Sequence, residues 1–266
     1  MRDAQVWNCM SGIPRTDLHV RKNKRNENRE VKYRMKRIGI IGAMEIEVAQ
    51  LKTMMENIVI TTKAGMDFYA GTINGKEVVV VQSGIGKVNA GMCTQILADL
   101  YQVDAVINTG VAGSLRNEIN IGDIVISTTA VQHDMDVTPL GYQKGFIPGM
   151  KELAFAADQE LSQLAVATCQ EVNPDIQVYT GIVATGDQFI ASREVKDSII
   201  SCFEASCTEM EGGAIAQAAF LNQIPFVIIR AISDKADNSA QMDYPEFERQ
   251  AVEHTVRLLD GMLKKL

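Results

Sequence analysis

Several acidic residues end or follow apolar stretches of this sequence, where a carboxyl group could act as a general acid, a general base or a ligand anchor. The segment TEMEGGAIA, residues 208–216, carries Glu209 and Glu211 on either side of a methionine and continues into an alanine-rich helix start. Acids in the first turn of a helix are favoured by the helix dipole without any chemistry. The alternative is that this segment delivers a carboxylate into a ligand pocket. The segment alone leaves both interpretations open.

Another acid closes the apolar stretch FVIIRAIS, residues 226–233. Asp234 stands where a buried strand would meet a pocket, and desolvation there would raise its pKa and keep the carboxyl protonated, as a general acid requires. An Asp that caps the following turn is the common alternative. It does not explain Arg230 within the same strand, because a buried guanidinium needs an anionic partner.

Three glycine-containing turns could bring backbone close to a ligand: GAMEIEV (42–48), SGIGKVNAG (83–91) and NTGVAGSL (108–115). The first lacks the spacing of a dinucleotide fingerprint, and helix capping accounts for its acids Glu45 and Glu47 as well as catalysis does. The second could cradle a phosphate on free backbone N–H groups, but it lacks the GK[ST] of a P-loop. A tight turn for packing explains it equally well.

The segment HDMDVTPLGY contains His133, Asp134 and Asp136, which resemble a metal-ligand set. These residues are too close together on one segment, and no distant motif supplies further ligands. With three histidines and no GxSxG motif, a Ser-His-Asp triad is also hard to build. We therefore expect neither a metal site nor a serine nucleophile.

The composition is that of a globular intracellular protein: 266 residues, 46% of them hydrophobic, with a net charge of -7. No apolar run is long enough to cross a bilayer, and the N-terminus lacks the apolar core of a secretory signal. The five cysteines form no CxxC pair, which suits a reducing compartment and argues against structural zinc. We expect a cytoplasmic location and no membrane partner.

The charge is unevenly distributed along the chain. Residues 1–34 hold nine Lys and Arg against four Asp and Glu, so this segment carries +5 and residues 35–266 carry -12. The polar basic segment predicts a disordered N-terminal extension over 1–34, with Met35 as the functional start of a single domain over 35–266. The acidic domain argues against nucleic acid as a partner.

After Met35, short β-branched runs alternate with helical patterns, which indicates an α/β layered domain. Continuous apolar runs predict central strands that are covered on both faces. The predicted strands are 37–43, 77–83, 105–110, 123–132, 177–185 and 226–233. The predicted helices are 45–56, 87–101, 151–172, 193–201, 211–222 and 244–265.

Taken together, the blocks GIIGAMEIEV, SGIGKVNA, INTGVAG, GDIVIS, HDMDVT, GDQFI, EMEGGAIA and RAISDKAD resemble, in order and spacing, those of the bacterial 5'-methylthioadenosine/S-adenosylhomocysteine nucleosidases. This family lies within the purine nucleoside phosphorylase superfamily. The resemblance covers about 230 residues from Met35 onward. It implies a three-layer α/β/α sandwich with a central twisted mixed sheet, a homodimer, no metal and no cofactor. The implied reaction is hydrolysis of the N-glycosidic bond of these adenine nucleosides, and of 5'-deoxyadenosine.

The resemblance also assigns the chemical roles. Asp234 is the implied general acid that protonates purine N7, and Glu47 the implied base that activates a water. Glu211 would grip the ribose hydroxyls with Met210 along the sugar, which leaves Glu209 as a structural residue. Arg230 would hold the water or the acidic pair.

The remaining implied contacts concern the base and the 5' substituent. Adenine would lie between Phe189 and the loop 111–113, with Ala112 and Gly113 beside it, Ile190 reading its edge through the backbone and Ser233 orienting Asp234. The apolar channel for the 5'-thio group would be formed by Met44, Ile85, Phe189, Met210 and Tyr244. The partner subunit would insert Val137, Leu140 and Tyr142.

The sequence departs from the family pattern at three of these positions. Many members have Ser where this chain has Val111, and phenylalanine is usual at Leu140 and Tyr244. The first change removes a hydroxyl near the expected water, and the others could retune substrate preference. Phosphorolysis, a related nucleosidase such as an aminodeoxyfutalosine hydrolase, and a non-catalytic nucleoside binder remain the alternatives.

Overall fold

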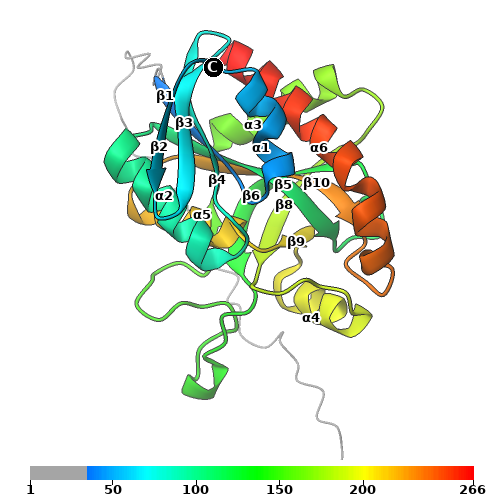
Figure 1. Cartoon of the computed structure of the whole chain (residues 1–266). Coiled ribbons are helices and arrows are strands. Elements are labelled where there is room, and N and C mark those ends of the chain that lie inside the picture. The colour runs from blue at the N-terminus through cyan, green and yellow to red at the C-terminus, as the bar shows by residue number, and fades with distance from the viewer. Residues whose placement is uncertain (1–34) are drawn as a thin grey trace, which may run out of the picture. The chain divides into compact units, whose positions relative to one another are not determined.

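One mixed sheet of ten strands organises the chain (Figure 1). The computed structural model describes residues 35–266, without the side chains of 241–243, 245 and 246, and the predicted extension 1–34 lies outside the described residues. The strands are β1 (Arg37–Gly42), β2 (Glu56–Lys63), β3 (Met66–Ile73), β4 (Lys76–Gln82), β5 (Ala105–Ser114), β6 (Ile124–Gln132), β7 (Phe155–Ala156), β8 (Val178–Thr185), β9 (Cys207–Glu209) and β10 (Phe226–Asp234). Their order is β10-β6-β8-β9-β5-β1-β4-β3-β2, with β7 paired to β6.

The predicted apolar runs form the centre of this sheet. β1 is parallel to both β4 and β5, and β5 is parallel to β10. Every residue of β5 and β10 is buried, as expected for strands covered on both faces. β10 also pairs antiparallel with β6, so this strand has a neighbour on each side. The carboxyl ends of β1, β5 and β10 therefore meet at one edge of the sheet.

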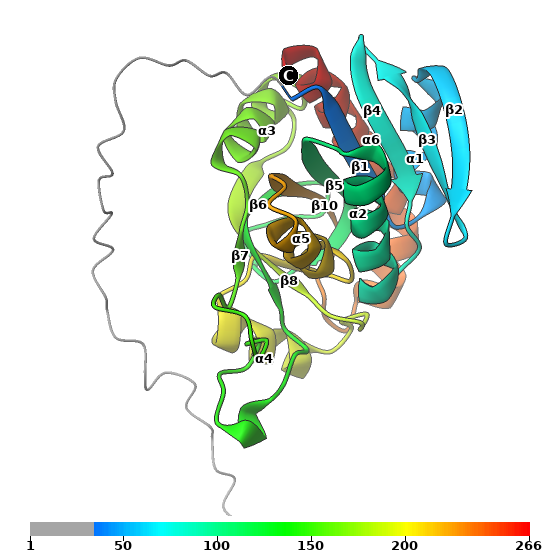
Figure 2. The ribbon, with the colours of Figure 1, turned by 90° about the vertical axis from the view of Figure 1, so that its left-hand side faces the viewer.

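Helices cover both faces of the sheet, as Figure 2 shows. They are α1 (Glu45–Thr53), α2 (Lys87–Tyr101), α3 (Gln159–Val172), α4 (Arg193–Phe203), α5 (Gly212–Leu221) and α6 (Ala240–Lys265), with a 3-10 turn η1 at Thr138–Leu140. α1, α3 and α6 enclose one hydrophobic core, and α2 and α5 enclose another on the opposite face. The predicted three-layer α/β/α arrangement is confirmed.

Three predicted helix boundaries are wrong by three or more residues, and one of them is the start of α6, which lies at Ala240 and not at 244. The helix predicted over 151–172 begins only at Gln159, where Asp158 caps it by accepting a hydrogen bond from the backbone N–H of Leu161 at 2.9 Å. The preceding residues include the buried Phe155, which pairs with β6 in strand β7. The helix predicted over 45–56 ends at Thr53, because residue 56 already belongs to β2.

Four strands have no counterpart among the predicted ones: β2, β3, β7 and β9. β2 is almost entirely exposed, so it lacks the alternation of buried and exposed residues that marks a strand. β2 and β3 are joined at Ala64 and Gly65, which both have positive φ angles of 50° and 76°, as a two-residue hairpin turn requires. Strand β9 is three residues long and carries no periodic signal.

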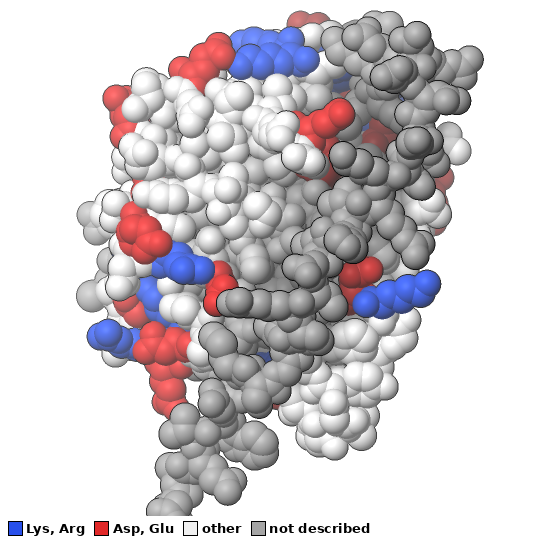
Figure 3. Space-filling view, turned by 180° about the vertical axis from the view of Figure 1, so that it is seen from behind, with Lys and Arg blue, Asp and Glu red and all other residues white. Residues whose placement is uncertain are grey.

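Two further expectations are that the protein has no membrane partner and no nucleic-acid partner. Among the described residues, no helix combines the length and the apolar character needed to span a membrane. Figure 3 shows one face of the molecule. On the part of this face that is not grey, basic and acidic side chains stand in small groups, and there is no continuous basic surface.

Candidate active site

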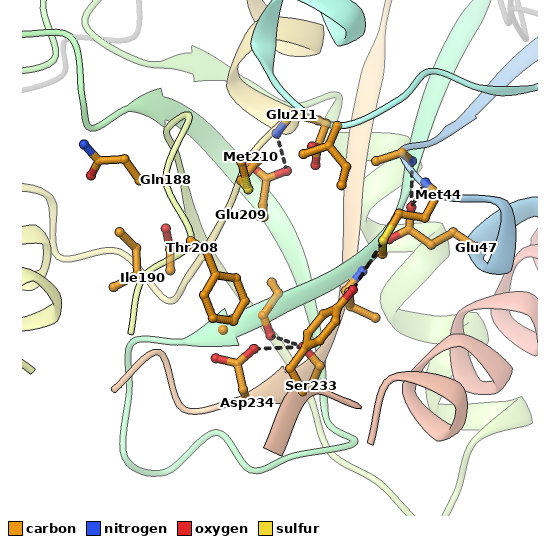
Figure 4. Close-up of a pocket in the computed structure, with 17 residues that line it drawn as sticks. Met44, Glu47, Gln188, Ile190, Thr208, Glu209, Met210, Glu211, Ser233 and Asp234 are labelled. Carbon is orange, nitrogen blue, oxygen red and sulfur yellow. Dashed lines mark hydrogen bonds between the residues drawn. The ribbon is translucent and has the colours of Figure 1, made fainter. Parts of the chain in front are cut away.

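A cavity of about 330 Å³ opens at the carboxyl ends of β1, β5 and β10, where α/β sheets place their ligands. Most of the predicted site residues line it: Met44, Glu47, Ile85, Ala112, Gly113, Phe189, Ile190, Met210, Glu211, Ser233, Asp234 and Tyr244. In Figure 4, Asp234 approaches from the end of β10, Glu47 from α1, and Glu211 from the segment that leads into α5. Acids far apart in the sequence are thus brought around one cavity.

Glu47 is fixed by backbone donors on two strands' ends. Its Oε2 accepts hydrogen bonds from the N–H groups of Ala43, at 2.6 Å, and Met44, at 3.0 Å, and its Oε1 accepts one from Val111 at 3.1 Å. Burial raises the pKa of this carboxyl, against the lowering effects of Arg230 and the three backbone bonds. Glu47 therefore caps α1 and also faces the cavity, so the capping interpretation is confirmed and the catalytic one stays a prediction.

Gly110 allows Glu47 and Arg230 to approach each other beneath the cavity. A Cβ atom at this position would lie 2.1 Å from Arg230 Nη1 and 2.4 Å from Glu47 Oε1, both far inside van der Waals contact. A side chain here would push the carboxylate and the guanidinium apart. The glycine of the INTG segment is therefore required by a close approach of charged groups.

Arg230 lies behind the cavity wall and does not line the cavity. Its side chain is 1% exposed, and its Nη2 donates to Asn108 Oδ1 at 2.6 Å and to Glu209 Oε2, while Glu211 Oε2 lies 3.6 Å away. The buried anionic partner that the sequence demanded is thus chiefly Glu209. Arg230 neutralises the acids from behind, which agrees with its expected role of holding an acidic pair.

Glu209 lines the cavity and also anchors the start of α5. Its Oε2 accepts from the backbone N–H groups of Glu211, at 3.1 Å, and Gly212, at 2.7 Å, and its Oε1 accepts from the Thr185 hydroxyl. These bonds satisfy donors at the helix N-terminus, so the structural reading of the first acid agrees with its contacts. The two acids of TEMEGGAIA divide the two tasks between them.

Glu211 faces the cavity from the N-terminus of α5 and contacts the N-terminus of α2. Its Oε1 accepts from the backbone N–H of Gly86 at 2.9 Å. Burial, followed by the nearby charge of Glu209, raises the pKa of Glu211 to about 7. The carboxyl of Glu211 therefore holds its proton to a higher pH than an exposed glutamate does.

Two backbone donors of the glycine-rich turn before α2 bind carboxylates of the protein. Besides the bond from Gly86 to Glu211, the backbone N–H of Lys87 donates to Asp187 Oδ1 at 2.8 Å. The Lys87 side chain forms an ion pair with Asp134 at 2.6 Å and does not line the cavity. This helix terminus, which could have held a phosphate, instead binds two carboxylates of the chain itself.

Asp234 ends β10 and is held in place locally. The Ser233 hydroxyl donates to its Oδ2 at 3.0 Å, and the backbone N–H of Ala236 donates to its Oδ1 at 2.7 Å. A Cβ at Gly113 would lie 2.7 Å from Oδ1, so the glycine permits β5 to pass close to the carboxyl. Residues 111–113, expected as a loop, belong to β5.

The outer wall of the cavity is apolar. Phe189 and Tyr244 meet edge to face, with ring centroids 5.8 Å apart, and the Tyr244 hydroxyl lies 3.3 Å from Met44 Sδ. Phe189 is 49% exposed and Ile85 53% exposed. This wall is open to solvent, unlike the buried acids beneath it.

The predicted residues Val137, Leu140 and Tyr142 do not line the cavity of their own chain. They lie in and around η1, in the long connection between β6 and β7 that extends from the sheet in Figure 2. Leu140 is 73% exposed. Their assignment to a partner's cavity stays a prediction.

The cluster His133, Asp134 and Asp136 has other partners than a shared ion. Asp134 pairs with Lys87, and Asp136 Oδ1 accepts from the backbone N–H and the hydroxyl of Thr138, at 3.0 and 2.7 Å. Within residues 35–266, no group of three or more His, Cys, Asp or Glu side chains is arranged to hold a metal ion.

Sequence reasoning missed three cavity residues: Ala43, Gln188 and Thr208. Gln188 stands inside the GDQFI block, next to the expected Phe189, so adjacency could have suggested it. Thr208 belongs to the missed strand β9 and directly precedes Glu209 and Met210, which also line the cavity.

A cavity at the strand ends of a mixed sheet, with acids beneath an open apolar wall, defines an α/β protein of the nucleoside phosphorylase-like class. The chain belongs to the phosphorylase superfamily, whose family model matches residues 37–264.

Comparison with individual proteins shows which members of the superfamily this chain is similar to. A 5'-methylthioadenosine/S-adenosylhomocysteine nucleosidase of Anoxybacillus flavithermus is 44% identical over 230 residues, covering 86% of this chain and 98% of the relative. A nucleosidase of the same name from Neisseria meningitidis, solved with methylthio-immucillin-A, has a TM-score of 0.84 and 38% identity over 87% of this chain and 100% of that one. Futalosine hydrolase of Helicobacter pylori has a TM-score of 0.83 and 32% identity, over 88% and 100%. The resemblance inferred from the sequence blocks is confirmed.

Proposed function

We propose that the protein is an N-glycosyl hydrolase that cleaves 5'-methylthioadenosine and S-adenosylhomocysteine, and also 5'-deoxyadenosine, to adenine and the corresponding ribose. The observation that carries this proposal is the arrangement of Glu47, Glu211 and Asp234 around one cavity with an apolar outer wall. The named relatives support it, because nucleosidases for the first two substrates share 38–44% of the sequence over nearly their whole length.

In the proposed reaction, Asp234 donates a proton to purine N7 while the bond between N9 and the anomeric carbon breaks. The bonding electrons leave with the base, so adenine departs neutral. Glu47 accepts a proton from a water molecule, whose oxygen bonds to the anomeric carbon. Because burial raises the pKa of Glu47, this carboxylate is a stronger base than an exposed one. The negative charges of Glu47 and Glu211 stabilise the cationic sugar.

The remaining cavity residues would position the nucleoside. Glu211 accepts hydrogen bonds from both ribose hydroxyls, and Met210 lies along the sugar. Adenine lies between Phe189 and the β5 segment at Ala112 and Gly113, with the Ile190 backbone at its edge. The 5'-thio group occupies the wall formed by Met44, Ile85, Phe189 and Tyr244. No step of this reaction requires a metal or a cofactor.

Hydrolysis is favoured over phosphorolysis by the occupation of the α2 N-terminus. The backbone donors there bind Glu211 and Asp187, and Lys87 is paired with Asp134. A phosphate in the cavity would face Glu47, Glu209 and Glu211, with Arg230 already engaged by Glu209. Like charges at such distances repel strongly in a poorly solvated site.

Adenine release from methylthioadenosine, measured with and without inorganic phosphate, tests the proposal. The expected products are adenine and free 5-methylthioribose, at a rate that phosphate does not change. A sugar phosphate product would show phosphorolysis. Faster release from 6-amino-6-deoxyfutalosine than from methylthioadenosine would move the protein toward the futalosine hydrolases, and binding without any release would identify a nucleoside-binding protein.

We further propose that the active unit is a homodimer in which Val137, Leu140 and Tyr142 of each chain complete the partner's cavity. Adjacent exposed side chains on α2 and α5 support this: Val88 (73% exposed), Met92, Phe220 and Leu221. Sedimentation should show a dimer, and Val88→Glu should yield monomers with reduced adenine release. A fully active monomer would contradict this arrangement.

A place in methionine salvage and a cytoplasmic location complete the proposal. The products of methylthioadenosine cleavage are the materials that a salvage route recovers. The buried thiols of Cys93, Cys169 and Cys207, which form no disulfide among the described residues, agree with a reducing compartment. Fractionation of cells that produce the protein would test its location.

A further inference from the structure

A carboxylate that forms no ion pair with any described side chain stands just beyond the apolar wall of the cavity. Glu248 lies one helical turn after Tyr244 on α6, and its Oε1 accepts a hydrogen bond from the Tyr244 hydroxyl at 2.6 Å. The same hydroxyl lies 3.3 Å from Met44 Sδ, and Met44 and Tyr244 both line the cavity. Glu248 is thus one hydrogen bond away from the outer end of the cavity.

Nothing in the described part of the chain neutralises this carboxylate. None of the ion pairs found among the described side chains includes Glu248, and its hydrogen bond from Tyr244 uses only one of its two oxygens. The Tyr244 hydroxyl fixes the side chain in position without removing its charge. The residue is partly buried, so its charge is screened less than that of a fully exposed acid.

The acids of the cavity reinforce this negative potential. The pKa of Tyr244 is raised first by burial, then by the bond to Glu248 and its charge, and also by the charges of Glu47 and Asp234. Two buried cations lie near the cavity among the described residues, and neither lines it: Arg230 is engaged by Glu209, and the Lys196 ammonium donates to the Lys235 carbonyl. A ligand group at the rim beside Tyr244 therefore meets acids on both its sides.

We propose that Glu248 and Tyr244 form a subsite that recognises a protonated amine on an extended 5' substituent. The proposal rests on the proposed function, because it takes the 5'-thio group of an adenine nucleoside to lie along Met44 and Tyr244. A methylthio group ends within the apolar wall. A longer chain passes Tyr244 and brings a terminal ammonium to the free oxygen of Glu248, as in nucleosides with an aminoalkylthio or amino-acid side chain.

Two isosteric ligands test this subsite: 5'-S-(4-aminobutyl)-5'-thioadenosine and 5'-S-pentyl-5'-thioadenosine, which differ by an ammonium in place of a methyl group. Their dissociation constants are measured by titration calorimetry in Asp234→Asn protein, so that no turnover occurs. The preference for the amine should fall about two- to fivefold on adding Glu248→Gln, the range expected for a partly exposed ion pair. Glu253→Gln, which removes an exposed charge from the same helix, should leave the ratio of the two constants unchanged.

A charge reversal gives the second variant. Glu248→Lys should favor a carboxypropylthio ligand over the aminobutylthio ligand, and added salt should weaken either preference. Equal ratios for Glu248→Gln and Glu253→Gln, or no reversal in Glu248→Lys, would overturn the subsite. Adenine release by the unaltered protein is measured separately and tests the proposed function. The dissociation constants test amine recognition, so the failure of one proposal is distinguished from the failure of the other.

Discussion

The inner and outer ends of the cavity are built in different ways. At the inner end, Glu47 and Glu209 are buried and held by backbone N–H groups from the turn between β1 and α1, from β5 and from the start of α5, with Arg230 behind them. At the outer end, Phe189 and Ile85 are half exposed and rest on side-chain contacts. The site thus fixes its charged groups to the sheet edge, while the wall that would meet the variable part of a substrate is open.

The largest effect is expected at the carboxyl between the two ends. Asp234→Asn should reduce adenine release by about 10²- to 10⁴-fold, the usual contribution of a general acid, while nucleoside binding is retained. Steady-state kinetics and calorimetry measure the two properties. Asp197→Asn, at an exposed position of α4, is the matched control. An Asp234→Asn protein with near-normal turnover would remove the general acid from the mechanism.

Substitutions at the inner end should also lower the free energy of unfolding more than substitutions at exposed positions. Glu209→Gln leaves Arg230 buried without its main counter-charge, and breaking a buried pair in this way costs about 3–5 kcal/mol in the free energy of unfolding. The exposed pair between Glu171 and Lys265 offers the comparison, since Glu171→Gln should cost about 0–1 kcal/mol. Urea denaturation gives both values. Similar losses in the two variants would show that the buried network is not what stabilises this region.

The raised pKa of Glu211 predicts opposite pH dependences for binding and stability. The ionised carboxylate is needed to accept the ribose hydroxyls, so kcat/KM for methylthioadenosine should rise with pH up to about 7 and then level off. The folded protein retains a proton that the unfolded chain releases above the ordinary value of 4.5, so the free energy of unfolding should fall across the same interval. Glu47, whose pKa burial also raises, adds to this fall.

Thermal unfolding between pH 5 and 7, compared with Glu211→Gln, measures the stability effect. The variant should flatten part of the slope, because it no longer titrates at this position. A melting temperature that rises with pH over this interval in the unaltered protein would contradict the assignment.

Substitutions at the outer end of the cavity should have smaller effects on binding and on the free energy of unfolding. Phe189→Ala removes a half-exposed apolar surface, so we expect a loss of about 1 kcal/mol in binding, or about fivefold in KM, with little change in the free energy of unfolding. Val59→Ala, on the exposed strand β2, serves as the control. A large loss of stability in Phe189→Ala would show that the outer wall is as much part of the core as the inner end.

The smallest effect is expected from the basic N-terminal segment. A chain that starts at Met35 should release adenine at the same rate as the chain that starts at Met1, because each group of the proposed mechanism lies at or after Ala43. Parallel kinetic assays of the two proteins measure this. An activity that depends on residues 1–34 would overturn the interpretation of this segment as an extension.

The central part of the fold was predictable because burial determines it. The apolar runs that became β1, β5 and β10 are covered on both faces, and such runs carry the same signal wherever they occur. The bounds of α2 were also predicted correctly. By contrast, β2 is exposed and has no such signal, although the Asn74-Gly75 pair, with positive φ at both residues, is a hairpin signal that could have revealed β3 and β4 as neighbours.

The candidate site also has features that could be predicted from the sequence and features that could not. Asp234 and Glu47 could be located because each follows an apolar strand, and the sequence shows where such strands end. The pairing of Arg230 with Glu209, or of Gly86 with Glu211, joins positions 21 and 125 residues apart. No local pattern encodes such a contact, since it depends on how the strands are ordered in the sheet.

The double pairing of β10 has a consequence for motion. β10 is hydrogen-bonded to β5 along most of its length and to β6 at residues 229–231, so its centre presents no free edge from which it could fray. The amide hydrogens of this central part should therefore exchange with solvent more slowly than those of the segments around the cavity. Any local motion that admits a nucleoside must therefore occur in the segments around the cavity and not in β10, which ends at Asp234.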